Sequence, residues 1–243
     1  MKNHTSLVYT ILLIFWVAFS EAQVLSYPNT TDTAYVFTAR SKFRAEASVS
    51  FGLGLTNLTV GKTTDGKDVT ISGGGGVSGN LALCYGLSSS WELSVAGGYQ
   101  ESALYPKVEN AEGSFSKIIV LTTLKYHIPW TFSGILKIGG GVGYYSPGDL
   151  DIDLSNVSGG GHNIFSYEGN IGFHLTCDYE LESTSRFSWG LGLKYYNTSY
   201  NLQSARSNGV SVPINLLPQE LKNETMKLDG SGIDLTIFVV VLL

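Results

Sequence analysis

Three chemically reactive residue types stand close together in the segment GNIGFHLTCDY, where His174, Cys177 and Asp178 fall within five positions. Imidazole, thiol and carboxylate groups build metal sites and cysteine-dependent active sites. The segment alternates apolar and polar residues, however, and this pattern predicts a β-strand. Cys177 then lies on the face opposite His174 and Asp178, which are about 13 Å apart along the strand. The sequence therefore predicts no metal site, no catalytic centre and no cofactor here.

The same two-residue period recurs through the chain and predicts eight β-strands. In the first, FRAEASVSFGLGL, an apolar residue occupies every second position from Phe43 to Leu55. The eight segments span residues 43–56, 76–87, 91–105, 114–128, 133–146, 164–181, 186–201 and 231–243.

The links between these strands alternate strictly between short and long. SSS, PWTF and ESTS join strands two to three, four to five and six to seven, whereas the other four links are long and polar. All short turns therefore fall at one end of the sheet, as in outer-membrane barrels. We predict an all-β fold, an eight-stranded antiparallel transmembrane up-and-down β-barrel. Cys84 and Cys177 then lie on opposite walls, too far apart for a disulfide, so both thiols are predicted to be free.

The apolar face of the strands is predicted to contact lipid. The opposite face is rich in glycine, serine and threonine, small residues that suit the narrow interior of eight strands. Aromatic residues collect toward both ends of the apolar face, as in the two girdles that flank the apolar band of membrane barrels. Near the short turns these are Tyr85, Trp91, Tyr126, Trp130, Tyr179, Phe187 and Trp189, and toward the long loops they are Phe51, Tyr99, Phe115, Tyr144, Phe165, Tyr167 and Tyr195.

Titratable residues on the small-residue face are predicted to point into the lumen. They are Arg44, Glu46, Glu92, Lys125, Lys137, Glu168, His174, Asp178, Arg186, Lys194 and Asp234. Five acidic and five basic side chains in one narrow interior must be paired, because an isolated buried charge costs on the order of several kcal/mol. One interpretation is a structural salt-bridge network, and the other is a narrow polar conduit for ions or protons. A wide aqueous pore is excluded, since eight strands do not enclose one.

The N-terminal residues predict export. Lys2 precedes a short apolar run and then small residues up to Ala22, the pattern of a cleavable secretory signal peptide. We expect residues 1–22 to be the signal peptide, 23–41 a short periplasmic segment and 42–243 the barrel domain. The formal net charge of −5 argues against a nucleic-acid partner, because nucleic-acid binding needs a basic face.

With these features the chain resembles the small eight-stranded outer-membrane barrels of Gram-negative bacteria, the OmpA/OmpX/OmpW-like group. The resemblance covers nearly everything after residue 40, and it rests on strands such as FRAEASVSFGLGL and FSWGLGLKYY rather than on a short motif. It implies an outer-membrane location, insertion by the outer-membrane assembly machinery and contact with the lipid bilayer. One departure is the end of the chain, TIFVVVLL, because members of this group usually end in an aromatic residue.

Members of such a group act as structural barrels, adhesins, serum-resistance factors, small channels or, occasionally, lipid-modifying enzymes. We expect a non-enzymatic barrel whose long external loops bind an extracellular ligand, since loops on a rigid scaffold usually carry binding. The alternative within the group is a narrow channel for small solutes or ions. An enzyme would need a nucleophile, a base and an orienting group near the outer rim. The nearest group of such residues is His162 with Asp149, Asp151 and Asp153. The three aspartates do not have the spacing of a calcium-binding loop, and we interpret this segment as a solvated acidic loop.

A second class of protein remains open, a secreted eukaryotic glycoprotein with a soluble β-barrel. Loops rich in asparagine, serine and threonine produce glycosylation sequons by composition alone, so we favour the membrane barrel. A soluble barrel would turn its apolar face inward, whereas a membrane barrel turns it outward. The six N-x-S/T sequons are at Asn3, Asn29, Asn57, Asn156, Asn197 and Asn223.

Overall fold

The computed structural model describes residues 43–63, 65–131, 134–156, 161–182, 186–217 and 225–243. The expected signal peptide and periplasmic segment lie outside these residues. Within the described ranges, no helix is both long and apolar enough to cross a bilayer.

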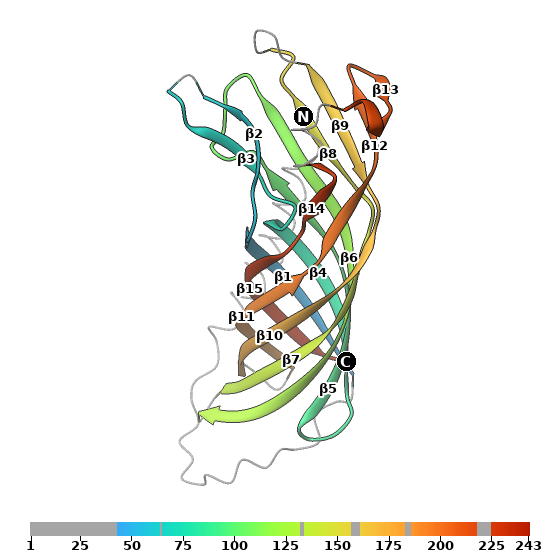
Figure 1. Cartoon of the computed structure of the whole chain (residues 1–243). Helices are drawn as coiled ribbons and strands as arrows, with labels where there is room; N and C mark the ends of the chain where they lie inside the picture. The colour runs from blue at the N-terminus through green and yellow to red at the C-terminus, as the bar shows by residue number, and fades with distance from the viewer. Residues whose placement is uncertain (1–42, 64, 132–133, 157–160, 183–185, 218–224) are drawn as a thin grey trace.

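Eight antiparallel strands close into a barrel (Figure 1). They are β1 (Phe43–Gly54), β4 (Gly75–Gly86), β5 (Trp91–Ala103), β6 (Glu112–Thr131), β7 (Gly134–Tyr145), β10 (Asn170–Glu182), β11 (Phe187–Asn197) and β15 (Gly232–Leu242). Each strand pairs with the next, and β1 pairs with β15 from Arg44↔Leu242 to Gly54↔Gly232, which closes the sheet. The predicted eight-stranded antiparallel barrel is confirmed.

The end of the barrel that carries the long links, called the upper end here, continues into further strands (Figure 1). These further strands are called the upper storey, and the eight-stranded barrel below them is called the lower storey. The upper storey consists of β2 (Leu58–Lys62), β3 (Asp68–Ile71), β8 (Gly148–Asp153), β9 (His162–Tyr167), β12 (Ser199–Ser207), β13 (Val210–Val212) and β14 (Lys227–Asp229), with the 3-10 turn η1 (Ile214–Leu216). β8 pairs with the upper part of β6, and β9 pairs with both β8 and β12. Three of the four long links therefore contain paired strands, which the sequence pattern did not predict.

The two storeys differ in which face of their strands points inward, the polar face in the lower storey and the apolar face in the upper storey. In β10, Leu175 is 56% exposed on the outside, whereas His174 beside it is 1% exposed in the lumen. In β8 and β9, apolar residues such as Leu150 and Phe165 are buried inside instead. The lower storey is thus polar inside and apolar outside, and the upper storey has the arrangement of a water-soluble sheet.

Two adjacent interruptions accompany this reversal. Residues 146–147 separate β7 from β8, and residues 168–169 separate β9 from β10. They lie side by side, because Tyr145 pairs with Asn170 and Gly148 pairs with Tyr167. Each break changes the strand phase by one residue, so a pattern extended through it assigns the wrong face.

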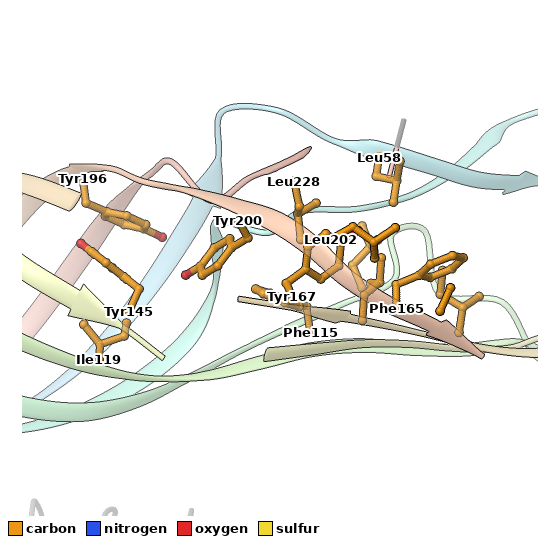
Figure 2. Packing of buried hydrophobic residues seen from close by; sticks show 14 of the residues in the cluster. Leu58, Phe115, Ile119, Tyr145, Phe165, Tyr167, Tyr196, Tyr200, Leu202 and Leu228 are labelled. Atoms are coloured by element: carbon orange, nitrogen blue, oxygen red, sulfur yellow. The ribbon is translucent and has the colours of Figure 1, made fainter. Parts of the chain in front are cut away.

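The main apolar core lies in the upper storey and at its junction with the barrel. Figure 2 shows part of this cluster, with Tyr145 and Tyr196 stacked beside Ile119 and with Leu58, Leu202 and Leu228 farther along. The buried residues of the cluster are Leu58, Ile71, Phe115, Ile119, Leu121, Tyr145, Leu150, Ile152, Phe165, Tyr167, Tyr196, Tyr200, Leu202, Ala205, Leu217 and Leu228. This core holds the upper strands together without lipid.

The outer surface of the lower storey is an apolar belt. Seven of the predicted girdle residues are exposed on it, namely Phe51, Trp91, Tyr99, Tyr126, Tyr144, Phe187 and Trp189, and three more, Tyr85, Tyr179 and Tyr195, are half-buried. The assignment is wrong for Phe115, Phe165 and Tyr167, which are buried in the upper core. Phe165 and Tyr167 lie above the break in phase, and Phe115 lies on the inner face of β6. The side chain of Trp130 lies outside the described part of the chain.

Candidate functional site

The candidate site is the network of charged side chains that fills the lumen of the lower storey. Its lowest layer centres on two carboxylates, those of Glu92 from β5 and Glu180 from β10. Arg44 forms ion pairs with both, at 3.3 Å from its Nη1 to Glu180 Oε1. Lys137 likewise pairs with Glu180 and lies 3.8 Å from Glu92. Strands β1, β5, β7 and β10 are thereby linked across the barrel interior.

Two further side chains complete this lowest layer. Ser188 Oγ donates a hydrogen bond to Glu180 Oε1 at 2.6 Å. His127 Nε2 lies 3.7 Å from Glu92 Oε2. All of these side chains are buried, so the layer fills the lower lumen with paired polar groups.

The second layer is built on Lys125. Its Nζ lies 2.8 Å from Asp178 Oδ2 and 3.7 Å from Glu46 Oε2, so one ammonium group pairs with carboxylates from β10 and β1, which are not neighbouring strands. Glycine makes room for this layer, because a Cβ added at Gly192 would lie 2.3 Å from Asp178 Oδ1. The small residues of the polar face therefore leave the space that the long charged side chains occupy.

His174 lies above this layer and makes a hydrogen bond of 2.8 Å between its Nε2 and Thr123 Oγ1. Cys177 is exposed on the outer face, and Cys84 is buried beside Ser94, so both thiols are free, as predicted. Among the described residues, no three His, Cys, Asp or Glu side chains are grouped to hold a metal ion.

The uppermost pair of the network is Lys194 and Asp234, which face each other on neighbouring strands with Nζ 2.8 Å from Oδ2. A Cβ added at Gly52 on the other side of Asp234 would lie 2.1 Å from its Oδ1. Glycine at this position lets the buried carboxylate fit between β1 and β11.

Two predicted lumen residues are not part of the buried network. Glu168 is exposed in the break between β9 and β10, because the alternation was extended past the end of a regular strand. Arg186 has the parity of the buried Ser188 but is exposed in the bend that precedes β11. The other nine predicted residues lie in the lumen, all buried except the half-buried Glu46.

Three lumen residues were missed, namely Glu180, His127 and Lys117, and all three are buried. The alternation could have found them, because Glu180 follows Asp178 by two residues, and Lys117 and His127 share the parity of Lys125. With Glu180 and Lys117 in place of the two misassigned residues, the described lumen again holds five bases and five acids. They are Arg44, Lys117, Lys125, Lys137 and Lys194 with Glu46, Glu92, Asp178, Glu180 and Asp234. The formal charges of these ten cancel.

In the upper storey, the acidic triplet and His162 lie on the outer face of β8 and β9. His162 Nε2 is 2.7 Å from Asp151 Oδ1, and both side chains are largely exposed. Nearer the barrel, burial acts to raise the pKa of Asp229, but hydrogen bonds from Thr56 and Ser231 outweigh it and hold that pKa below its usual range.

A closed eight-stranded barrel with an apolar belt outside and balanced charges inside defines a class of fold, that of the small outer-membrane barrels. No protein-family model matches the sequence, and no curated protein matches it either. Among solved structures, the outer membrane protein OprG from Pseudomonas aeruginosa superposes with a TM-score of 0.55 at 11% identity, over 84% of this chain and 97% of that one.

Two other solved structures are similar at lower scores. The Neisserial surface protein A gives a TM-score of 0.49 at 13% identity, over 84% of this chain and 98% of that one. The attachment invasion locus protein Ail of Yersinia pestis gives 0.43 at 10% identity, over 84% and 98%. The likeness to OprG confirms the expected fold, and the function has to be argued from the residues of this chain.

Proposed function

We propose that this chain is a non-enzymatic integral barrel of the Gram-negative outer membrane. Its lumen is blocked by side chains, and its upper storey is the surface that binds external partners. The observation that carries the proposal is the reversal of the two faces at one level of the barrel. Below the paired breaks, apolar side chains are exposed around the barrel, and above them apolar side chains are buried. A bilayer that surrounds the lower storey and ends at the level of the breaks accounts for the exposed apolar side chains below and the buried apolar side chains above.

This reversal weighs against the soluble-barrel alternative. A soluble barrel has to bury its apolar face, whereas Leu81, Leu175 and Ile171 of the lower storey are more than half exposed. Large contiguous apolar surfaces on a protein mark contact with another phase or partner. A belt that runs around the whole lower barrel is better matched by lipid than by one protein partner.

The closed lumen supports a structural role over transport. Salt bridges in the lowest layer connect four strands of the wall, and Lys125 adds a second layer above it. Rearrangement of this network would separate buried ion pairs, and a buried charge left without its partner costs about 3–5 kcal/mol. The narrow-channel alternative would require this network to open.

The upper storey supports a role in binding. It projects from the barrel on paired strands, and its outer residues are mostly polar. Three large apolar side chains are strongly exposed there and offer anchor points for a partner, namely Tyr105 in the link between β5 and β6, Val210 at the start of β13 and Leu216 in η1. Binding surfaces commonly place a few such anchors within a polar rim.

Refolding in detergent tests this proposal. The mature chain should require detergent or lipid to stay dispersed, and the unboiled protein should migrate differently from the boiled protein on a gel. In planar bilayers it should show only rare or very small conductance. A mature chain that is monomeric and folded in buffer without detergent would overturn the membrane assignment, and steady conductance would favour the channel.

A further inference from the structure

Residues 72–74 connect β3 to β4 inside the upper mouth, and together with Gly75, the first residue of β4, they are called the cap segment here. Gly73, Gly74 and Gly75 are all buried. A Cβ added at Gly74 would lie 2.1 Å from the carbonyl oxygen of Ser231, and one at Gly73 would lie 2.7 Å from Leu228 Cγ. The segment therefore packs against the β14–β15 side of the mouth, and only glycine fits there.

Side chains from the other walls hold the backbone of the cap segment. Ser102 Oγ donates to the carbonyl of residue 72 at 2.6 Å, and Gln100 Nε2 donates to the carbonyl of Gly75 at 2.6 Å. The amide of Gly75 donates to Tyr196 Oη at 2.7 Å. These partners come from β5 and β11, which are not neighbours in the barrel. The cap segment is consequently tied to two separate parts of the wall and lies inside the upper mouth.

Lys117 of β6 makes the fourth contact, because its Nζ donates to the carbonyl of Gly73 at 2.6 Å. The same ammonium group lies 5.4–5.8 Å from the ring centroids of four aromatic residues, Phe115, Tyr145, Tyr196 and Tyr200. Among the described residues, no carboxylate lies within ion-pair distance of it, unlike Lys125, Lys137 and Lys194. Lys117 is thus held by one carbonyl and by ring faces, a weaker set of partners than a buried carboxylate.

The cap segment also has a built-in place to turn. Gly75 and Gly76 have φ angles of +73° and +90°, a region that other residues rarely adopt. Both glycines belong to the start of β4 and pair with Leu53 and Gly52 of β1, and two residues farther on Ser78 faces the lumen between its neighbours Ser50 and Gln100. Residues 73–75 are held only through their backbone groups, and Ser72, the one side chain of the segment, donates a hydrogen bond to the carbonyl of Thr56 and accepts one from the amide of Gly74. A turn at the two glycines can therefore move the segment out of the mouth without displacing a large packed side chain.

We propose that the cap segment is a removable plug, that Lys117 is its latch, and that its release admits small hydrophilic solutes from the upper side into the lumen. The part of the lumen that would open is lined by Ser50, Ser78, Thr236 and His174, which suits polar rather than apolar solutes. The charge network below remains the second barrier. This inference rests on the proposed function, because it takes the barrel as membrane-embedded with its upper end outside.

A buried cysteine reporter tests the plug. Ser78→Cys is introduced together with Cys84→Ser and Cys177→Ser, and the refolded barrel in detergent micelles is treated with a trimethylammonium-ethyl thiosulfonate. The reporter should react slowly in this parent. Adding Lys117→Met, which keeps a side chain of similar length among the rings but removes the ammonium group and its hydrogen bond, should raise the labelling rate at least about tenfold, since a charged donor makes one of the stronger hydrogen bonds. Lys62→Met on exposed β2 removes the same charge away from the cap and should leave the rate unchanged.

The outcomes separate this inference from the proposed function. An unboiled gel on every variant reports whether the barrel has formed, and if Lys117→Met does not fold, Gln100→Leu provides the same test through the Gly75 anchor. Equal, slow labelling in the parent and in the folded anchor variants would overturn the removable plug and leave a fixed cap. Fast labelling in the parent would show that the cap does not close the mouth. A chain that stays folded without detergent would instead contradict the membrane proposal.

Discussion

At the residue scale, Glu180 is the acceptor on which the lowest lumen layer depends. It pairs with Arg44 and Lys137 and accepts a hydrogen bond from Ser188. Glu180→Gln removes the charge with almost no change in volume and leaves two buried cations short of a partner. We expect a loss of about 3–5 kcal/mol in the free energy of unfolding, measured by urea titration in micelles. Glu168→Gln is the matched control on the exposed break, and a similar loss there would contradict the assignment.

The Lys194–Asp234 pair allows two free energies to be measured separately. One is the cost of leaving a single buried charge without its partner, and the other is the net contribution of the intact pair to stability. Asp234→Leu alone leaves the ammonium of Lys194 in the lumen without its partner at 2.8 Å. We expect this single change to destabilise the barrel by about 3–5 kcal/mol, and Asp234→Leu with Lys194→Met to recover most of that loss. The comparison is a double-mutant cycle on unfolding free energies. A double variant as unstable as the sum of the two singles would mean that the pair contributes nothing as a unit.

At the element scale, Asp229 joins β14 to the link that follows β1. Its Oδ2 accepts a hydrogen bond of 2.6 Å from Thr56 Oγ1, and its Oδ1 accepts one of 2.9 Å from the amide of Ser231. Asp229→Ala should speed amide hydrogen exchange in β14 several-fold, an effect of about 1 kcal/mol or less for so exposed a carboxylate. Asp65→Ala, in the turn between β2 and β3, should leave exchange in β14 unchanged.

The same carboxylate predicts a pH dependence with a definite sign. Because the folded structure lowers the pKa of Asp229, the ionised group stabilises β14 at neutral pH. That contribution is complete above the ordinary aspartate pKa of about 3.9 and is lost as the pH falls through the lowered value. The exchange rates of wild type and Asp229→Ala should therefore differ at neutral pH and converge in acid. A difference that persists unchanged in acid would mean that the charge of Asp229 does not hold β14.

Most strands of the lower storey were predictable because they alternate over the thickness of a membrane, whereas the fourth and eighth, with KIIVLTTL and IFVVVLL, are apolar on both faces for part of their length and were assigned by their place in the series. The upper storey was not predictable, since the breaks at residues 146–147 and 168–169 shift the phase by one, and nothing in a two-residue period marks that shift. For this reason Tyr167, which was expected on the outer face, is buried, and Glu168, which was expected in the lumen, is exposed. Gly73, Gly74 and Gly75 were predicted to belong to a long link, and only the tertiary fold shows that Gly73 accepts a hydrogen bond from Lys117 inside the mouth.

At the scale of the whole molecule, the position of the bilayer follows from where the faces reverse, and one residue in each storey can test it. Leu175 lies outward in the middle of β10, and Gln203 lies outward on β12 of the upper storey. If lipid surrounds only the lower storey, Leu175→Lys should cost about 2–4 kcal/mol of folding free energy in phospholipid vesicles, the price of a lysine near the bilayer midplane. Gln203→Lys places the same charge in water and should change stability by less than about 0.5 kcal/mol. Equal, small effects at both positions would mean that no bilayer covers the belt, and the exposed apolar surface would then have to contact protein.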